Sequence, residues 1–307
     1  MSLVCLYVNI DVKENNNLCE KFHKKGAKMN KLLINEKLKE FYIEDIGHQD
    51  ITAANIFPSK EKTTAYFYAK ESGVLAGVNI IEQMYAIIDA NVKVSLKKAD
   101  GETVEVKETI AEVTGPVQAI LTGERIILNL LQRMSGIATM TYQTVQKLND
   151  PTIKVCDTRK TTPGLRMFEK YAVTCGGGFN HRNGLYDGVM IKDNHIVAAG
   201  SIQKAVEKVR DAVGPMVKIE VETETKEQVM EAVEAACDII MFDNRPPAEI
   251  KELLPLVPAH ILTEASGGIT PDTIHTFNGV GVDVISLGFL THSVSALDIS
   301  LMLEGGY

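Results

Sequence analysis

The fold is decided by residues 217–243, VKIEVETETKEQVMEAVEAACDIIMFD, which read as a strand, a helix and a second strand. VKIEVE (217–222) and DIIMFD (238–243) are short and rich in β-branched and other apolar residues, a composition typical of strands buried in a parallel sheet. The helical segment between them, residues 225–236, is long enough to carry the chain back to the start of a neighbouring parallel strand. The stretch therefore predicts a parallel βαβ unit.

The same strand-then-helix rhythm extends in both directions from this unit. The further predicted strands are IKVCD (153–157), GVMIK (188–192), HILTEAS (260–266) and VDVISLG (282–288). Each of the six strands ends on a polar residue or a glycine, and the carboxyl ends of barrel strands converge on the face where active sites lie. In an open doubly wound sheet, only the strand ends beside the switch point would meet. The chain is therefore predicted to be α/β, with an incomplete barrel of about six strands.

The residues before the barrel predict a mixed α+β domain. Residues 30–42 have apolar side chains at helical spacing, 63–76 read as strand, turn and strand, and 117–148 read as a helix that breaks at Ser135-Gly136. The predicted division is an extension of unknown role at 1–29, an N-terminal domain at 30–134 joined by a C-terminal helix at 290–307, and a barrel domain at 135–289.

Composition excludes several classes of protein. The chain has 307 residues and a net charge of −8, which disfavours a surface that coats nucleic acid. No apolar run reaches the roughly 18 residues that a membrane helix needs, and residues 1–10 lack the basic start of a secretory signal. The five cysteines are odd in number and form no CxxC pair, which is typical of reduced thiols. We therefore expect a cytoplasmic protein that binds neither nucleic acid nor membrane.

The arginines are few and lie close together in the sequence. Of 32 basic residues, 25 are lysine and seven are arginine, and five of the seven fall between Arg125 and Arg182. A guanidinium binds carboxylate or phosphate through two parallel hydrogen bonds, which the lysine ammonium cannot do. The group favours an anion-binding site, although chance and surface ion pairs explain any single arginine better.

Two loops carry most of the candidate cations, one after the predicted strand 153–157 and one before the predicted strand 188–192. DTRKTTPGLR (157–166) surrounds a Thr-Pro-Gly turn, and reads either as a grip for a multiply charged anion or as a solvated loop. GGGFNHR (176–182) contains three glycines, which let the backbone approach a ligand closely but also form ordinary turns. The candidate side chains in these loops are Arg159, Lys160, Arg166, His181 and Arg182.

Lys192, in VMIKDNH, has three interpretations. It is a cation that binds phosphate or carboxylate, a Schiff-base nucleophile, or one half of an ion pair with Asp193. A Schiff-base lysine requires a depressed pKa, which crowding by the neighbouring cations would supply. The sequence leaves all three interpretations open.

Three carboxylates stand on the two strands of the opening βαβ unit. Glu220 and Glu222 alternate with apolar residues, so both point to one face of their strand, and Asp243 ends the next strand. Buried acids are costly unless they meet cations or a metal ion. Magnesium typically uses one or two protein carboxylates together with substrate phosphates. A magnesium site and an internal cluster of ion pairs with the arginines both account for the three residues.

A phosphate site is predicted at the ends of the last two strands. Ser266-Gly267-Gly268 follows a strand, and Thr270 with Pro271 supplies an N-cap and a first helical position. Free backbone N–H groups at such a helix start bind phosphate. Ser286-Leu287-Gly288 ends the next strand, and loops at these two positions form the usual phosphate site of an α/β barrel.

Seven motifs in a fixed order make the chain similar to the quinolinate phosphoribosyltransferase family, the decarboxylating nicotinate-nucleotide pyrophosphorylases of NAD biosynthesis. The resemblance covers residues 30–304 and rests on GERIILNLLQRMSGIAT, DTRKTTPGLR, GGGFNHRNGLYDGVMIKDNHI, IEVE, MFDN, EASGGI and ISLGFLTHS. Such an ordered series is far more specific than any one of its members. It implies an N-terminal α+β sandwich domain, an incomplete barrel, and a homodimer or higher even oligomer in which each site borrows residues from its partner.

The resemblance also implies roles for individual residues. Arg125 resembles the arginine that reaches into the neighbouring subunit's site. Glu222 and Asp243 resemble acids near the ribose and Mg²⁺, with metal contacts that are direct or run through water and diphosphate, and together with Lys160 they resemble the catalytic residues. The residues that resemble the substrate-binding set are Arg125, Thr158, Arg159, Lys160, Arg166, His181, Arg182, Lys192, Glu222, Asp243, Ser266, Gly267, Gly268, Ser286, Leu287 and Gly288.

The implied reaction agrees with this inventory of residues. Quinolinate carries two carboxylates, and 5-phosphoribosyl 1-diphosphate carries a phosphate and a diphosphate, so bringing them together requires dense positive charge. With Mg²⁺, phosphoribosyl transfer to quinolinate and decarboxylation would give nicotinate mononucleotide, CO2 and diphosphate without a protein nucleophile. A Schiff-base lyase and a non-catalytic protein that binds phosphorylated sugars are the alternatives.

Overall fold

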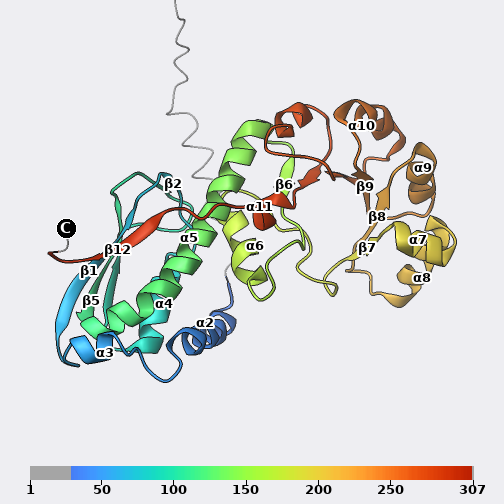
Figure 1. The fold of residues 1–307 in the computed structure, drawn as a ribbon. Coiled ribbons are helices and arrows are strands. Elements are labelled where there is room, and N and C mark those ends of the chain that lie inside the picture. Colours follow the sequence, from blue (N-terminus) through green and yellow to red (C-terminus); the bar gives the residue numbers. More distant parts are fainter. Residues whose placement is uncertain (1–28, 306–307) are drawn as a thin grey trace, which may run out of the picture.

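An antiparallel sheet forms the N-terminal part of the protein, whose computed structural model describes residues 29–305. The strand order is β12-β1-β5-β3, with β1 at Lys62–Ala69, β3 at Lys93–Leu96, β5 at Thr109–Pro116 and β12 at Ile299–Leu303. The helices beside it are α2 (Lys31–Ile46), α3 (Ala53–Ile56), α4 (Asn79–Ile88) and the first half of α5 (Val117–Leu148). α4 and α5 pack against the sheet and α2 packs against both helices (Figure 1), so the predicted α+β sandwich is formed.

The alternating pattern of β1 explains why its sheet is covered on one face. Ala65, Phe67 and Ala69 are fully buried, whereas the intervening Tyr66 and Tyr68 are only half-buried. Side chains of successive residues in a strand point to opposite faces, so the buried set faces the helices and the tyrosines face outward.

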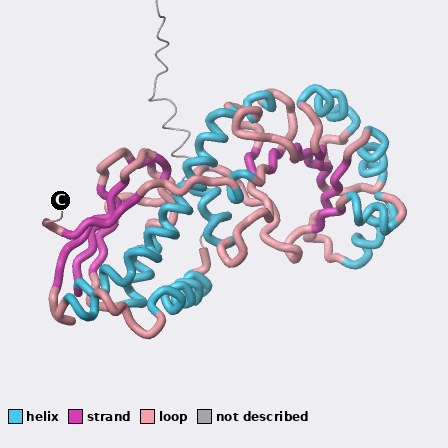
Figure 2. The backbone as a smooth tube through the Cα atoms, in the orientation of Figure 1, coloured by secondary structure: helices cyan, strands magenta, loops and turns pink. Residues whose placement is uncertain are grey.

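The second part of the protein is a six-stranded parallel sheet curved into an open barrel (Figures 1 and 2). The strand order is β6-β11-β10-β9-β8-β7, with β6 at Lys154–Cys156, β7 at Val189–Ile191, β8 at Ile219–Thr223, β9 at Ile239–Asp243, β10 at Leu262–Ser266 and β11 at Val284–Ser286. All six strands predicted from the sequence are present. Within residues 29–305, the edge strands β6 and β7 do not pair with each other, so the prediction of an incomplete α/β barrel is confirmed.

Helices line the outer side of the barrel (Figure 2). They are α6 (Arg166–Cys175), α7 (Asp193–Ala199), α8 (Ile202–Ala212), α9 (Lys226–Glu234), α10 (Pro247–Leu253) and α11 (Phe289–His292), with 3-10 turns η2 (Leu254–Leu256) and η3 (Ile274–Phe277). Side-chain caps fix where α8 and α9 begin. Ser201 accepts a hydrogen bond from the backbone N–H of Lys204, and Thr225 and Gln228 form a reciprocal capping box.

The predicted break of the long helix at Ser135-Gly136 is wrong, because α5 runs unbroken through both residues. Ser135 is buried, and its Oγ accepts a hydrogen bond from the backbone N–H of Ala76 at 3.1 Å. A Cβ on Gly136 would lie 2.2 Å from the carbonyl oxygen of Ser295. The small residues therefore permit the close approach of neighbouring backbone and do not end the helix.

Residues 63–76 form the predicted strand, turn and strand, as β1 and the short β2 (Gly73–Val74), and β2 pairs with β4 (Thr103–Val104). One prediction about the last part of the chain is wrong. The predicted C-terminal helix at 290–307 is replaced, within the described residues, by α11 and by the strand β12, which pairs antiparallel with β1. The segment thus returns to the N-terminal domain as predicted, but it supplies a sheet edge instead of a helix. The predicted extension at 1–29 lies outside the described residues, apart from Met29.

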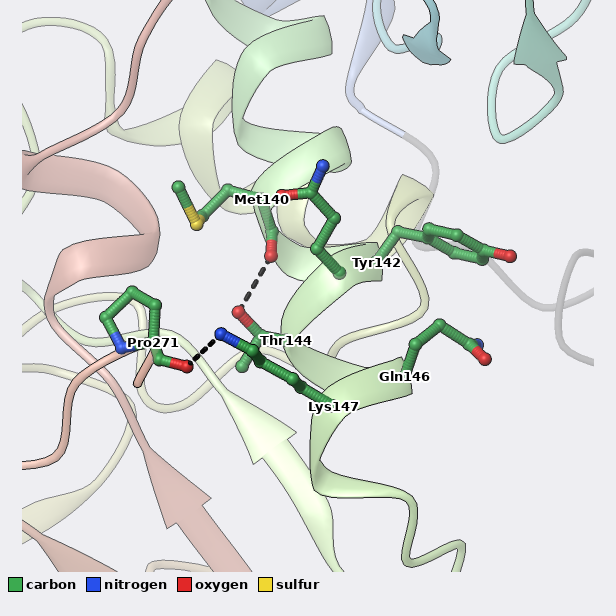
Figure 3. A pocket seen from close by; sticks show the side chains of 7 residues that line it. Met140, Tyr142, Thr144, Gln146, Lys147 and Pro271 are labelled. Carbon is green, nitrogen blue, oxygen red and sulfur yellow. Dashed lines mark hydrogen bonds between the residues drawn. The ribbon is translucent and has the colours of Figure 1, made fainter. Parts of the chain in front are cut away.

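The C-terminal end of α5 contacts the loop before η3. Lys147 Nζ donates to the carbonyl oxygen of Pro271 at 2.9 Å (Figure 3). The contact closes one side of a shallow, mainly apolar hollow, lined by Met140, Tyr142, Gln143, Thr144, Gln146, Lys147 and Pro271.

Among the described helices, none combines the length and the apolar character needed to cross a membrane.

Candidate active site

The carboxyl ends of four barrel strands lie level with one another. Parallel pairing aligns Asp243 of β9 with Ser266 of β10, Ser266 with Ser286 of β11, and Ser286 with Cys156 of β6. Because neighbouring parallel strands point their aligned side chains to the same face, these strand ends build one polar surface.

The loop after β6 carries Arg159 and Lys160, and the segment between α6 and β7 carries His181 and Arg182. The backbone N–H of His181 donates to Asp157 at the end of β6, and Lys192, just after β7, pairs with Glu222 of β8, so these segments meet at the same mouth of the barrel.

The 157–166 loop is held in place by an ion pair beneath it. Arg133 of α5 donates from Nε and Nη2 to Glu169 Oε1 at 2.8 and 2.6 Å, and its Nη2 also donates to Thr162 Oγ1 at 2.7 Å. Glu169 is fully buried, and its other oxygen accepts the backbone N–H of Thr162 at 3.1 Å. Thr291 Oγ1 donates to the carbonyl oxygen of Lys160 at 2.7 Å. The loop that carries the predicted cations is therefore fastened to α5, α6 and α11.

Arg159 and Arg182 form the cationic wall of the site. Arg182 donates from Nη1 to the carbonyl oxygen of Gly188 at 2.9 Å, and burial together with the charge of Arg159 lowers its pKa. The Nε of Arg159 is buried without a hydrogen-bond partner among the described residues. Two guanidiniums that repel each other, one with an unused buried donor, are suited to a ligand with more than one negative charge.

His181 lies behind this wall and is already fully engaged. Its Nδ1 accepts the backbone N–H of Arg182 at 2.8 Å, and its Nε2 lies 3.2 Å from Glu220 Oε2 and 3.3 Å from Glu264 Oε2. Because Nδ1 is an acceptor, the ring proton lies on Nε2, between the two carboxylates. The predicted contact of His181 with substrate stays a prediction, since both ring nitrogens have protein partners in this structure.

Two of these three side chains, His181 and Glu220, have raised pKa values. Burial alone would lower the pKa of His181, but the hydrogen bonds and charges of Glu220 and Glu264 outweigh burial and raise it. Burial also raises the pKa of Glu220, whose Oε1 has no hydrogen-bond partner within residues 29–305. Because His181 and Glu220 contact each other, the two shifts belong to the interacting pair and not to either side chain alone.

Lys192 and Glu222 form an ion pair at the barrel mouth. Lys192 Nζ lies 2.6 Å from Glu222 Oε2, so the alternative pairing with Asp193 is wrong. The side chain of Lys192 is 45% exposed and can turn toward a ligand. Asp243, on the adjacent strand β9, forms no ion pair within residues 29–305, and within these residues its carboxylate accepts a side-chain hydrogen bond only from the amide of Asn244, at 2.7 Å. The two carboxylates supply oxygen ligands of the kind that Mg²⁺ prefers, so this pair fits a magnesium site.

The loop after β10 lies close against Asp243. Gly267 and Gly268 have φ values of +82° and +64°, which residues with a Cβ rarely adopt. A Cβ on Gly267 would also lie 2.4 Å from Asn244 Oδ1 and 2.7 Å from Asp243 Oδ1. Glycine is therefore required here for the backbone to approach the neighbouring strand end.

The predicted helix start after this loop is wrong. Thr270 forms a turn, with its backbone N–H donating to Thr273 Oγ1 at 2.9 Å, and the short 3-10 helix η3 begins only at Ile274. Phosphate binding by the Ser266-Gly267-Gly268 loop stays a prediction, but a helix N-terminus at Pro271 does not contribute to it.

The remaining predicted residues of the barrel lie at the same mouth. Thr158 Oγ1 accepts the backbone N–H of Lys160 at 3.0 Å. The side chain of Lys160 passes over Gly288, where a Cβ would lie 2.8 Å from Lys160 Cδ. Leu287 is buried beside Gly288. Arg166 connects the two cationic loops, because it donates to Thr161 Oγ1 at 3.0 Å and to the carbonyl oxygen of Asn183 at 3.1 Å.

Arg125 is the one predicted site residue that the structure places elsewhere. It lies on the N-terminal half of α5 and lines a small hollow with residues of the α2–α3 region. The lining residues are Asp45, Ile46, Gln49, Asp50, Ile51, Leu121, Thr122 and Arg125. Within a single chain, Arg125 is therefore not part of the barrel site.

Sequence reasoning missed the buried polar residues that support the site. Asp157 forms a buried ion pair with Lys170 and accepts the side-chain amide of Asn180 at 2.5 Å and the backbone N–H of His181 at 2.9 Å. Glu264 holds Ser286 and faces His181. For Glu264 a signal was present, because alternation along β10 places it on the same face as Ser266.

Comparison with known proteins gives the same family over nearly the whole described chain. Residues 50–135 match the model of the quinolinate phosphoribosyl transferase N-terminal domain, and residues 137–302 match that of the C-terminal domain. A probable nicotinate-nucleotide pyrophosphorylase [carboxylating] of Bacillus subtilis is 55% identical over 273 residues, covering 89% of this chain and 94% of that protein.

A plant protein and a solved structure agree with this match. A mitochondrial quinolinate phosphoribosyltransferase [decarboxylating] of Nicotiana tabacum is 40% identical, covering 88% of this chain and 82% of that protein. The crystal structure of NadC from Streptococcus pyogenes superposes with a TM-score of 0.87 at 41% identity, covering 90% of this chain and 98% of that one. This chain belongs to the quinolinate phosphoribosyl transferase family.

Proposed function

We propose that this protein transfers the phosphoribosyl group of 5-phosphoribosyl 1-diphosphate to quinolinate with decarboxylation. The products are nicotinate mononucleotide, CO2 and diphosphate, and the reaction belongs to the de novo synthesis of NAD. The observation that carries the proposal is the meeting of a cationic wall, two carboxylates and a glycine loop at one mouth of the barrel. The names of the relatives support the same reaction.

Quinolinate binds to the cationic wall in this proposal. Arg159 offers a buried, unpaired Nε–H, and Arg182 and Lys192 flank it with further positive charge. Two carboxylates on the ligand would replace the mutual repulsion of the cations with charge-assisted hydrogen bonds. The resulting geometry directs the ring nitrogen of quinolinate toward the ribose.

Phosphoribosyl diphosphate occupies the other half of the mouth. The 5′-phosphate lies at the Ser266-Gly267-Gly268 and Ser286-Leu287-Gly288 loops, where the backbone can approach it closely. The diphosphate lies near Lys160 and beside Asp243 and Glu222, which would hold Mg²⁺ directly or through water and diphosphate oxygens. When bound, the metal ion supplies positive charge that stabilises the departing diphosphate.

The transfer exchanges one bond at ribose C1 for another. The C1–oxygen bond to diphosphate breaks, and the ring nitrogen of quinolinate bonds to C1 through an oxocarbenium-like state that Asp243 and Glu222 stabilise by their negative charge. The nitrogen is then cationic, so its charge stabilises the electron pair left on the adjacent ring carbon when the carboxylate departs as CO2, and a proton then bonds to that carbon. Lys192 needs to form no covalent bond in this sequence, and it forms an ion pair with Glu222.

The complete site is shared between two subunits of a homodimer or a higher even oligomer. Exposed apolar side chains lie on the same domain as Arg125, where Ile51, which lines the hollow with Arg125, is 70% exposed and Ile56 is 64% exposed. The loop beside the cationic wall exposes Leu185 and Tyr186, at 73% and 84%. Exposed apolar groups at both places are suited to an interface that brings Arg125 to the partner's barrel mouth.

The three described cysteines are free, in keeping with a cytoplasmic location.

The test is product formation with phosphoribosyl diphosphate and magnesium, with quinolinate or nicotinate offered in parallel. We expect nicotinate mononucleotide and CO2 from quinolinate alone. Product from nicotinate alone would keep the phosphoribosyl transfer and change the substrate. Binding of both substrates without any product would favour a non-catalytic protein, and borohydride trapping of a substrate on Lys192 would favour a Schiff-base lyase.

A further inference from the structure

One buried carboxylate, Glu264, connects the two halves of the site. It stands in the middle of β10 and is only 1% exposed. Its Oε1 accepts the Oγ–H of Ser286 at 2.5 Å, and its Oε2 lies 3.3 Å from Nε2 of His181. Ser286 belongs to the phosphate loops, and His181 lies behind the cationic wall, so a single side chain contacts both.

Each contact of Glu264 continues into a group that faces the mouth. Ser286 Oγ lies 3.0 Å from Ser266 Oγ, at the start of the glycine loop. On the other side, His181 Nδ1 accepts the backbone N–H of Arg182, which fixes the start of the Arg182 side chain. A continuous buried network therefore runs from the phosphate loops through Glu264 to the cationic wall.

His181, Glu220 and Glu264 also place three potential metal ligands together, within 4.8 Å of one another. Binding of a cation would require a lone pair on Nε2 of His181. The Arg182 N–H donates to Nδ1, so Nδ1 has the lone pair and Nε2 carries the hydrogen. The three side chains are consequently arranged as a hydrogen-bonded group around one ring proton.

This arrangement explains why position 264 requires a carboxylate. Both neighbours of Glu264 are donors, the Nε2–H of His181 and the Oγ–H of Ser286, and a carboxylate has two acceptor oxygens for them. A glutamine of the same shape has one acceptor and one donor. In either orientation of the amide, one of the two present hydrogen bonds is lost or has its direction reversed.

We propose that Glu264 is a positioning residue that holds the quinolinate-binding wall and the 5′-phosphate loops in register with each other. The proposal rests on the function proposed above, because it assigns the two halves of the mouth to those two substrates. Glu264 itself touches neither substrate and acts through His181 and Ser286. Its replacement weakens the binding of both substrates at once.

The experiment compares Glu264→Gln with the unmodified protein by titrating quinolinate and, separately, phosphoribosyl diphosphate with Mg²⁺, followed by calorimetry. We expect both dissociation constants to rise about tenfold, the effect of losing one hydrogen bond to a charged group. A double variant combines Glu264→Gln with Ser286→Ala. Its loss of binding free energy for phosphoribosyl diphosphate should be smaller than the sum of the losses in the two single variants, because both changes break the same hydrogen bond.

Two control variants separate positioning from folding. Glu112→Gln removes a carboxylate on the N-terminal sheet, far from the barrel, and should leave both dissociation constants unchanged. Glu264→Asp keeps two acceptor oxygens on a shorter side chain that cannot reach both donors, and it replaces Glu264→Gln if that variant fails to fold. A folded Glu264 variant that binds both substrates within about twofold of the unmodified protein would overturn the proposal. Absence of turnover in the unmodified protein, with this binding pattern intact, would refute the proposed reaction only.

Discussion

The guanidinium of Arg159 has a hydrogen-bond donor in the site that is available to a ligand. An N–H group that is buried without a partner costs about 1–3 kcal/mol, and Arg159 Nε has none among residues 29–305. Such a cost is tolerated at functional sites because the ligand supplies the acceptor. The unpaired atom therefore indicates where an anion belongs.

Replacement of Arg159 should separate activity from stability. We predict that Arg159→Ala lowers kcat/KM for quinolinate about 100-fold, as expected for the loss of two charge-assisted hydrogen bonds. The melting temperature should not fall, because the change removes an unsatisfied donor. Steady-state kinetics and thermal unfolding measure the two effects, with the remote, exposed Lys147→Ala as a control. Near-normal kinetics would exclude Arg159 from the site.

For single residues, the sequence predicted the loop cations of the site but not the buried carboxylate that supports them. The loop cations Arg159 and Arg182 were predictable because arginines that cluster in loops have few structural reasons to do so. Glu264 was not singled out, because its role depends on donors from two distant segments, His181 and Ser286. Long-range hydrogen bonds of this kind leave little trace in local sequence.

The long helix α5 approaches the backbone at Ser295 closely. In an exposed helix, replacement of glycine by alanine adds up to about 1 kcal/mol of stability. At Gly136 the new Cβ would lie 2.2 Å from the Ser295 carbonyl oxygen, so we predict that Gly136→Ala destabilises the protein by about 2 kcal/mol or more. Urea unfolding measures the difference.

The matched control is Gly214→Ala. This glycine has no atom within 4 Å of a built Cβ and has an ordinary backbone conformation. Its replacement should be neutral or slightly stabilising. Equal effects of the two variants would show that the close approach of α5 to residue 295 does not limit stability.

Asp238 joins the strands β8 and β9 to α8 and gives a pH-dependent prediction. Burial alone would raise its pKa, but hydrogen bonds from Lys218, the Ile219 backbone and Arg210, at 2.9 to 3.0 Å, lower it below the ordinary 3.8. A carboxyl whose pKa is lower in the folded state stabilises the fold above the unfolded pKa, and this contribution is lost as the pH falls through the folded pKa.

We predict that Asp238→Asn lowers the free energy of unfolding at pH 7 by about 1–3 kcal/mol. The difference from the unmodified protein should shrink as the pH falls below about 4, where both forms become neutral at this position. Chemical denaturation at a series of pH values measures it. Asp272→Asn, at a side chain that is 95% exposed, is the control and should change little at any pH. A difference that stays constant down to the lowest pH would contradict the assignment.

The elements themselves were predictable where local pattern decides them. All six barrel strands are short β-branched runs, and the structure contains each of them. The C-terminal strand β12 was not predictable, because its partner β1 lies more than 200 residues earlier. Pairing between distant segments is decided by the whole sheet, which no local window contains.

Arg125 lies on the N-terminal half of α5, away from the barrel mouth of its own chain. At the scale of the whole molecule, it can therefore reach a barrel site only in a partner subunit. We predict that Arg125→Ala and Lys192→Ala subunits, each inactive alone, recover activity when mixed. In a hybrid dimer, one of the two sites combines an intact barrel with an intact Arg125. Random exchange should therefore restore about a quarter of the activity of the unmodified protein. No recovery despite verified subunit exchange would contradict the shared site.

The reaction itself is tested most directly by following the carboxylate that is lost. Quinolinate labelled with carbon-13 in its 2-carboxylate would be incubated with the protein, Mg²⁺ and phosphoribosyl diphosphate. We predict one labelled CO2 for each nicotinate mononucleotide formed, and no labelled CO2 when phosphoribosyl diphosphate is left out, because the carboxylate departs only after the ring nitrogen has become cationic. Labelled CO2 released without phosphoribosyl diphosphate, or nicotinate mononucleotide formed from nicotinate and not from quinolinate, would contradict the proposed function.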